Sequence, residues 1–242
     1  MKGVAKEFLG VSSPFKSGRF SNFYMADLEG KQYVYREFKD KIPQDIIRNI
    51  ANLTDERYSE EYLTPLFLVH NFSKNAFDGY LTEPNDRLIT LDEIEDYERK
   101  KEVLREAKSI ITKLHKYYGR VHGDVNISSI LFDTDSEKVF LQNFDNSIKI
   151  GQSLESQKFF SEYIKNYLKY NPLDYSVDIY SFNLNTLAIL SGLTPHEVIK
   201  GLLYGQFNLP EENIMVRKLS KELLLDGTKK KYSGKFIIDY IE

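Results

Sequence analysis

Alternating apolar and polar positions near the start of the chain predict short β-strands. The segment RFSNFYMADL places Phe23 and Met25 on one face, and the run KQYVYREF follows directly after Glu29 and Gly30. An acidic residue followed by glycine between two such runs is a signal for a β-hairpin. We therefore expect an antiparallel strand pair in this part of the chain.

The next segment changes its period from that of a strand to that of a helix. In IPQDIIRNIANL the isoleucines recur at helical spacing, and Pro43 is tolerated in the first turn of a helix. Two further apolar runs follow, YLTPLFLV and FDGYLTEP, with the turn-rich NFSKNA between them. This order of elements predicts a small sheet with one helix packed on it.

After EPNDR the pattern becomes mainly helical. Thr90 and Glu93 have the spacing of a capping box, and behind them apolar residues form one stripe of a helix. The stripe consists of Leu104, Ala107, Ile111 and Leu114, with Val103 and Ile110 beside it. GRVHGD ends this helix, and the runs ISSILFD and KVFLQNF, joined by the turn DTDSEK, predict a second hairpin.

The last third of the chain contains two further predicted helices. VDIYSFNLNTLAILSGL is apolar nearly all round and therefore predicts a buried helix. Thr194, Pro195 and Glu197 open the other helix with a cap, a proline at the first position and a glutamate three residues after the cap. We expect one α+β domain over residues 1–242, with a sheet part at about 1–84 and a helical part at about 85–242.

Composition narrows the class of protein. The 242 residues are 41% hydrophobic and 29% charged, the usual balance for a soluble globular chain, and the net charge of −3 gives no electrostatic argument for nucleic acid. The chain has no cysteine, which excludes disulfides and thiolate metal sites and fits a reducing compartment. No apolar run approaches the ~18 residues that a membrane span requires. We therefore expect a cytoplasmic protein with neither a nucleic-acid nor a membrane partner.

Six short strings resemble motifs of the protein kinase-like superfamily, in the family's order, from about Ser12 to about Leu193. These strings are KSGRFSNFYMAD, YVYREF, GYLTEP, KLHKYYGRVHGD, FLQNFDNS and VDIYSF. The resemblance implies a bilobal kinase-like fold with a small antiparallel-sheet N-lobe and a mainly helical C-lobe. It also implies ATP as the bound nucleotide, together with Mg²⁺ or Mn²⁺.

The resemblance assigns four residues to nucleotide binding. Gly18 is the one glycine retained from the Gly-rich loop, and Arg36 stands where the family has the lysine that contacts the α- and β-phosphates. Thr82 takes the gatekeeper position, and Glu83 follows it at the hinge. Arginine keeps its charge but is longer and forked, so it does not replace lysine freely. In the family, the lysine at this position pairs with a glutamate of the helix. In this chain either Asp55 or Glu56 lies at about the right distance in sequence to pair with Arg36.

The catalytic loop is matched by RVHGDVNISSILFD. Asp124 takes the place of the carboxylate that orients and deprotonates the attacking hydroxyl. Asp178 matches the buried aspartate that braces this loop from behind. Gly123, where many members have arginine, implies that activation-loop phosphorylation is not the on-switch. His-Gly-Asp is also the form found in small-molecule phosphotransferases that resemble aminoglycoside kinases.

The metal-binding positions depart from the family pattern. Ser129 stands where the family has an asparagine, and Asn143 stands where it has the aspartate that bridges Mg²⁺ to the phosphates. A neutral amide removes a full negative charge from a site for a hard cation. Asp145, two residues further on, points the same way in an extended segment and can replace the lost ligand. The alternative is that Asp145 is an exposed turn residue.

These changes give an ordered set of functional hypotheses. The first is a pseudokinase, a kinase-like nucleotide-binding domain with weak or lost phosphotransfer and a regulatory or binding role toward a protein partner. The alternative is an active atypical ATP-dependent Ser/Thr protein kinase that uses Asp124 as its base, or a nucleotidyl transferase resembling selenoprotein O. A small-molecule phosphotransferase is disfavoured by VDIYSF and by the short stretch after it, which leaves little room for a substrate-binding insert.

Overall fold

The computed structural model describes residues 2–84, 87–156, 160–208, 213–224 and 234–242 of this mixed α+β protein. The chain divides into two compact units. The first unit comprises Met1–Leu88, Gln142–Asn146 and Leu154–Phe159, and the second comprises Ile89–Leu141, Ser147–Ser153 and Phe160–Glu242. None of the helices among the described residues has both the length and the apolar composition needed to cross a bilayer.

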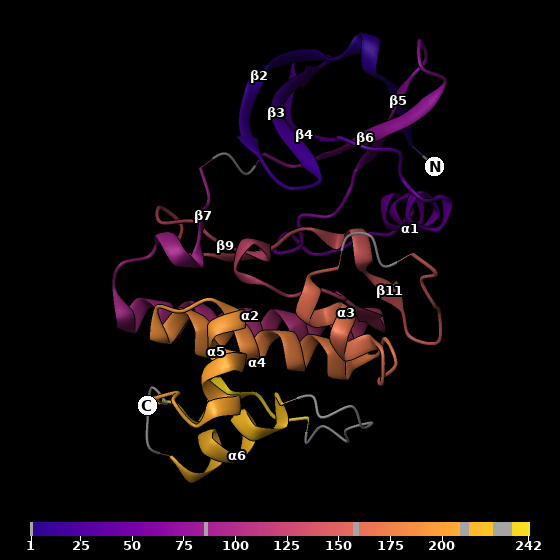
Figure 1. Ribbon diagram of the computed structural model, residues 1–242. Coiled ribbons are helices and arrows are strands. Elements are labelled where there is room, and N and C mark those ends of the chain that lie inside the picture. The colour runs from indigo at the N-terminus through magenta and orange to yellow at the C-terminus, as the bar shows by residue number, and fades with distance from the viewer. Residues whose placement is uncertain (1, 85–86, 157–159, 209–212, 225–233) are drawn as a thin grey trace. The chain divides into compact units, whose positions relative to one another are not determined.

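A sheet of six strands forms the first unit (Figure 1). The strands are β1 (Gly3–Ala5), β2 (Gly10–Ser17), β3 (Ser21–Leu28), β4 (Lys31–Phe38), β5 (Phe67–Asn71) and β6 (Ala76–Thr82). Their spatial order is β1-β5-β6-β4-β3-β2, and every neighbouring pair is antiparallel except β1 and β5. A short 3-10 helix, η1 (Lys6–Phe8), follows β1.

The predicted hairpin between β3 and β4 is confirmed. Glu29 and Gly30 connect the two strands, with φ angles of 55° and 81°. Two positive φ values give the turn a twist that matches the right-handed twist of the strands, which is why a glycine follows an acidic residue here. Strand β1 was not predicted, because three residues are too few to display a period.

The predicted helix of the first unit is α1 (Gln44–Asp55), which contributes to a core on one face of the sheet. Ile46 and Ile50 are fully buried there, in a cluster with Phe38, Leu68 and Tyr80. A second cluster buries residues from β3, β4, β5 and β6, among them Ala26, Tyr35, Val69 and Leu81. Successive residues of a strand point to opposite faces, so the central strands carry apolar side chains toward both clusters.

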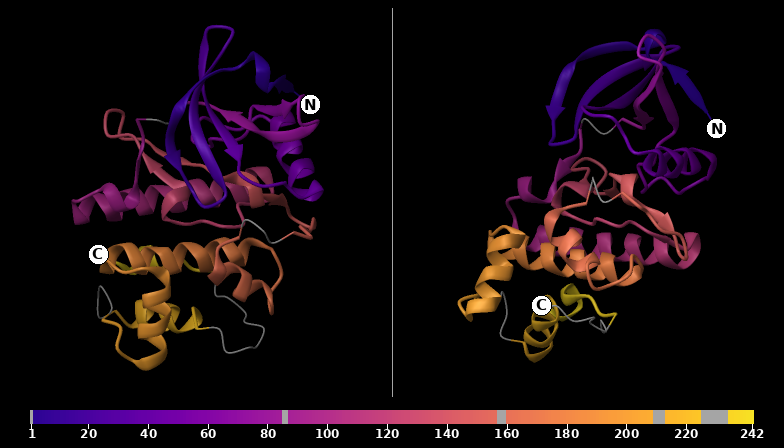
Figure 2. Two further views of the ribbon diagram at one scale, coloured as in Figure 1. Left: turned by 45° about the horizontal axis from the view of Figure 1, so that its top comes forward. Right: turned by 45° about the vertical axis from the view of Figure 1, so that its right-hand side comes forward.

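The second unit is mainly helical. Its helices are α2 (Tyr97–Tyr118), α3 (Glu162–Leu168), α4 (Tyr175–Ser191), α5 (Pro195–Tyr204) and α6 (Ile214–Glu222). The long helices α2 and α4 lie side by side in both views of Figure 2. Every residue of α4 from Val177 to Leu190 is buried, as expected for a helix that is apolar nearly all round. A final 3-10 helix, η5 (Ile237–Tyr240), lies near the C-terminus.

Short strands lead into and out of these helices. Strands β7 (Ile89–Thr90), β9 (Ile130–Phe132) and β10 (Val139–Leu141) form one sheet, and β8 (Arg120–Val121) pairs with β11 (Ile148–Lys149). The antiparallel pairing of β9 with β10 confirms the second predicted hairpin. The segment before β9 contains the 3-10 helix η3 (Ile127–Ser129).

Both predicted capping boxes form, but only one of them starts the helix to which it was assigned. Thr90 and Glu93 do form a capping box, but it caps the N-terminus of the 3-10 helix η2 (Leu91–Glu93) instead of the start of the long helix. Helix α2 begins after Asp96, whose carboxylate accepts a hydrogen bond from the backbone N–H of Arg99 at 2.6 Å. Helix α5 begins as predicted, with the box of Thr194 and Glu197 and with a proline in its first turn.

Candidate functional site

The register of the sheet in the first unit places two of the candidate nucleotide residues, Arg36 and Thr82, on one face. Arg36 of β4 lies opposite Phe23 of β3 and Tyr80 of β6, and directly paired residues share a face. Thr82 follows Tyr80 by two positions and therefore lies on the same face. The face thus presents a guanidinium, two aromatic rings and a hydroxyl from three adjacent strands.

Arg36 is the centre of a buried polar network on this face, with 8% of its surface exposed. Its Nη1 lies 2.6 Å from Asp145 Oδ2 and donates to the hydroxyl of Tyr80 at 2.8 Å, while its Nε donates to Ser21 Oγ at 2.9 Å. Burial is the largest single influence and disfavours the charged guanidinium, but Asp145 and Tyr80 together outweigh it and raise the pKa of Arg36. The side chain is therefore a fixed cation with an internal counter-charge.

Asp145 supplies that counter-charge from the 3-10 helix η4 (Phe144–Asn146) of the first unit. Its Oδ1 accepts a hydrogen bond from the Tyr80 hydroxyl at 2.9 Å, and its backbone carbonyl accepts one from Asn49 of α1 at 3.0 Å. Only 3% of Asp145 is exposed, so the alternative that it is an exposed turn residue is wrong. Burial raises the pKa of Tyr80, which keeps its hydroxyl available as a donor.

Asn143 completes the network two residues before Asp145. Its Oδ1 accepts a hydrogen bond from Arg36 Nη1 at 3.1 Å, and its backbone adopts a left-handed conformation with φ of 67°. Asparagine is one of the few side chains that adopt this conformation readily. The structure therefore brings together three of the residues predicted from sequence, and the carboxylate beside Arg36 is Asp145, in place of the predicted Asp55 or Glu56.

The remaining nucleotide candidates of the first unit have local partners. The backbone N–H of Gly18 donates to the Ser21 carbonyl at 2.8 Å, in the turn between β2 and β3. The buried Thr82 hydroxyl donates to the backbone carbonyl of Glu83 at 3.1 Å. Glu83 itself is exposed and forms an ion pair with Lys31 at 3.4 Å. These contacts leave the side chain of Thr82 on the same face as Arg36.

In the second unit, the loop that carries Asp124 is held by a carboxylate from α4. Asp178, which is fully buried, accepts hydrogen bonds from the backbone N–H groups of His122 at 2.7 Å and Gly123 at 2.8 Å. Its Oδ2 also lies 2.8 Å from Nε2 of His115. Gly123 has a φ of 92°, a conformation that favours glycine, so the arginine of many kinases would be strained here.

Asp124 is buried beside a serine of its own unit. Its Oδ1 accepts from the Ser161 hydroxyl and its Oδ2 accepts from the Ser161 backbone N–H, both at 2.8 Å. Burial raises the pKa of Asp124 to about 6, although the hydrogen bonds from Ser161 act in the opposite direction. A carboxylate with such a pKa is suited to accept a proton near neutral pH.

Ser129 serves a structural role in the same loop. Its hydroxyl donates to the carbonyl of Asn126 at 2.7 Å and accepts from the N–H of Asn126 at 2.8 Å, which closes a capping box around η3. The side chain of Asn126 in turn donates to the backbone carbonyl of Asp124 at 3.0 Å. Asparagine is a favoured N-cap residue, so Asn126 is itself a capping signal that sequence reasoning could have used.

The predicted metal ligands do not form a site for a hard cation as they are arranged. Asn143 Oδ1 and Asp145 Oδ2 contact the Arg36 guanidinium, whose positive charge would repel Mg²⁺ or Mn²⁺, and Asp145 Oδ1 accepts from the Tyr80 hydroxyl. The Ser129 hydroxyl is engaged by the backbone of its own turn. The arrangement in the first unit is instead suited to hold one guanidinium rigidly. Sequence reasoning missed three residues of this network, which are Ser21, Asn49 and Tyr80.

Comparison with protein-family models and with curated proteins gives no match to this chain.

Proposed function

We propose that the chain is a cytoplasmic, protein kinase-like nucleotide-binding domain with weak or lost phosphotransfer, which acts as a regulatory module toward a protein partner. The observation that carries this proposal is the buried ion pair between Arg36 and Asp145. The two residues occupy the phosphate-contacting and metal-binding segments of the kinase-like pattern. Their charges are directed at each other within the first unit.

The ion pair weakens the contact that a nucleotide phosphate needs. A phosphate is bound best by a cation whose charge and hydrogen bonds are free for its oxygens. Arg36 already directs Nη1 toward Asp145, Tyr80 and Asn143, and Nε toward Ser21. In this proposal the nucleotide therefore binds through contacts of its nucleobase with the sheet face more than through charge on its phosphates.

Metal-assisted transfer is disfavoured by the same network. In the kinase-like reaction, divalent cations neutralise charge that develops on the transferred phosphoryl group. Here the oxygens of Asn143 and Asp145 face a guanidinium. We therefore assign these two residues to positioning Arg36, and the proposal contains no step that passes through a metal ion.

The second unit supports the kinase-like part of the proposal. Asp178 accepts hydrogen bonds from two backbone N–H groups of the loop that carries Asp124, which fits the bracing role that the resemblance implies. A loop held in this way keeps the geometry of a catalytic loop whether or not transfer survives. Together with a sheet unit that carries one helix, this favours a bilobal kinase-like fold.

The alternative function is an active atypical ATP-dependent protein kinase, or a nucleotidyl transferase, with Asp124 as the base. One observation favours it: the Asp124 carboxylate already holds a serine hydroxyl at 2.8 Å, the geometry that a general base needs toward an acceptor. The pKa of about 6 places the carboxylate in its proton-accepting form at neutral pH. A small-molecule phosphotransferase has no comparable support.

A transfer assay separates these functions. The purified chain is incubated with labelled ATP and Mg²⁺ or Mn²⁺, alone and with a general protein substrate, beside the variant Asp124→Ala. We expect label incorporation close to background in both proteins, because the residues in the metal-binding segment engage Arg36. Incorporation well above background that is lost in Asp124→Ala would overturn the proposal in favour of an active enzyme.

A further inference from the structure

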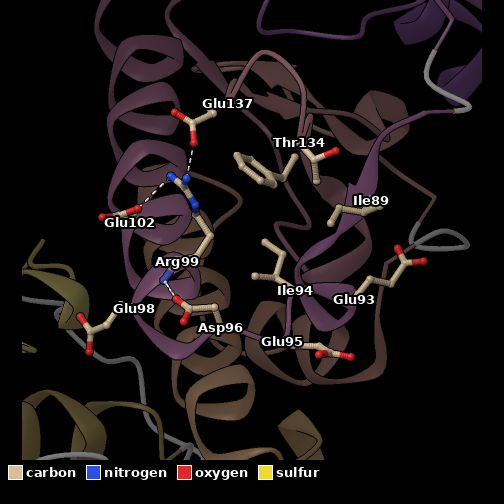
Figure 3. Close-up of a pocket in the computed structure, with 11 residues that line it drawn as sticks. Ile89, Glu93, Ile94, Glu95, Asp96, Glu98, Arg99, Glu102, Thr134 and Glu137 are labelled. Atoms are coloured by element: carbon tan, nitrogen blue, oxygen red, sulfur yellow. Dashed lines mark hydrogen bonds and ion pairs between the residues drawn. The ribbon is translucent and has the colours of Figure 1, made fainter.

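A surface pocket of the second unit has a chemistry that the proposed nucleotide site does not use. It lies at the start of α2 and has a volume of about 590 Å³, within the range of sites that hold ligands. Its lining comes from β7, η2, the segment between η2 and α2, the first turns of α2 and the β9–β10 hairpin, and Figure 3 shows the lining side chains. Its acidic lining residues are Glu93, Glu95, Asp96, Glu98, Glu102 and Glu137.

The floor of the pocket is apolar. Ile94 and Phe132 are each 5% exposed, and Ile89 beside them is partly buried. These three side chains come from different elements and meet in one place, which gives an apolar surface framed by carboxylates. Such a surface favours a ligand that carries aliphatic groups as well as charge.

Arg99 shows how the pocket accommodates a cation. Its guanidinium lies 5.5 Å from the centre of the Phe132 ring and forms ion pairs with Glu102, at 2.9 Å, and with Glu137 (Figure 3). A guanidinium above an aromatic ring and between carboxylates is a favourable arrangement. Arg99 is also the one cationic side chain among the described residues that line the pocket.

The other carboxylates are not all explained by local structure. Glu93 closes the capping box with Thr90, and Asp96 caps α2, so these two have structural roles. Glu98 forms an ion pair with Lys101 at 2.8 Å. Within the described part of the chain, Glu95 is exposed and has neither a hydrogen bond nor an ion pair. An excess of negative charge therefore remains around the apolar floor.

We propose that this pocket docks a basic, amphipathic peptide segment of a partner protein. Arginine or lysine side chains of the segment pair with Glu95 and the neighbouring rim carboxylates, and its apolar side chains cover Ile94 and Phe132. Charge complementarity selects the sign of the partner, and the apolar floor selects a peptide over a simple cation. The inference goes beyond nucleotide binding, because none of the pocket residues belongs to the proposed nucleotide site.

The test uses three fluorescein-labelled peptides and measures binding to the full chain by anisotropy. The first repeats Leu-Arg-Arg, the second replaces leucine by serine, and the third replaces arginine by glutamate. We expect the Leu-Arg-Arg peptide to bind, and the serine peptide to bind at least about tenfold more weakly, because buried leucine contributes most of the apolar term. Equal binding of the serine peptide, or of spermine in its place, would overturn docking in favour of counter-ion attraction.

A pair of charge-matched variants locates the site. Glu95→Gln removes one rim carboxylate, and Glu106→Gln removes an exposed carboxylate of α2 that does not line the pocket. We expect Glu95→Gln to weaken binding of the Leu-Arg-Arg peptide about two- to fivefold, as one exposed ion pair contributes, and Glu106→Gln to leave it unchanged. Equal effects of the two variants, binding of the glutamate peptide, or no binding of any peptide would contradict the proposal.

Discussion

Asp124 is held in a setting that disfavours its own charge. Burial raises its pKa from 3.8 to about 6, so the folded protein binds the proton more tightly than the unfolded chain does. A folded-state pKa above the unfolded value means that the stabilising effect of the proton is fully present below pH 3.8 and is lost as the pH rises through about 6. Ionisable groups whose burial lowers the stability of the fold are found most often at functional sites.

Replacing Asp124 by asparagine tests this at the residue scale. The amide oxygen can accept from the Ser161 N–H, and the amide nitrogen can donate to the Ser161 hydroxyl, so the contacts of the carboxylate are largely preserved. We expect Asp124→Asn to raise the free energy of unfolding by up to about 3 kcal/mol at pH 8, because a buried charge is removed. At pH 5 the gain should be clearly smaller. Urea unfolding at both pH values measures it.

A control with the same change of charge accompanies this experiment. Asp135 is exposed in the β9–β10 turn of the same unit, so Asp135→Asn should change stability by a small amount that is equal at the two pH values. A gain for Asp124→Asn that is the same at pH 5 and pH 8, or a loss at pH 8, would show that burial does not penalise the Asp124 carboxylate.

At the scale of elements, local patterns predicted most of the fold. The β3–β4 hairpin, α1 and α4 were predicted correctly because the signal for each lies within its own residues. Strand β1 was missed because its partner β5 is distant in sequence and its length shows no alternation. The box of Thr90 and Glu93 was recognised but assigned to α2, since spacing alone does not say which element a cap closes.

The candidate site was predictable in its membership but not in its pairing. Motif order identified Arg36, Asn143 and Asp145 as residues of interest. The sequence could not show that Asp145 is the carboxylate beside Arg36, because the two residues come from a central strand and a distant loop. Tyr80 and Ser21 were missed because their roles depend on strand register, which brings their hydroxyls to the guanidinium.

Strand β6 approaches β4 unusually closely beside Arg36. A Cβ added to Gly79 would lie 1.9 Å from the backbone carbonyl oxygen of Arg36, and a backbone atom cannot move aside cheaply. We therefore expect Gly79→Ala to lower the free energy of unfolding by at least about 2 kcal/mol, measured by urea denaturation. It should also displace Arg36 from its network.

The matched control lies in the same sheet. A Cβ at Gly10 in β2 would meet its nearest atom at 3.5 Å, an ordinary contact. Gly10→Ala should therefore leave stability within about 0.5 kcal/mol of the parent. If Gly79→Ala were as stable as Gly10→Ala, the close approach of β4 and β6 would be refuted.

At the scale of the whole molecule, the units are compact in space but not continuous in sequence. The first unit takes Gln142–Asn146 and Leu154–Phe159 from the middle of the chain, and these include the carboxylate of Asp145. A fragment that ends at Leu88 would lack this counter-charge for Arg36, and an unpaired buried charge is strongly destabilising. The site of the first unit therefore needs the segment Gln142–Asn146 as well as the chain up to Leu88.

The measurement that tests the central claim most directly is the melting temperature of the full chain with ATP, with Mg²⁺ and with excess chelator. A ligand that binds only the folded state raises the melting temperature. Because Asn143 and Asp145 engage Arg36, we predict that ATP raises it equally with and without the metal. In Asp145→Asn, where the guanidinium loses its counter-charge, the shift caused by ATP should be larger than in the parent. A shift in the parent chain that appears only with Mg²⁺, or no shift with ATP at all, would contradict a metal-independent nucleotide-binding domain.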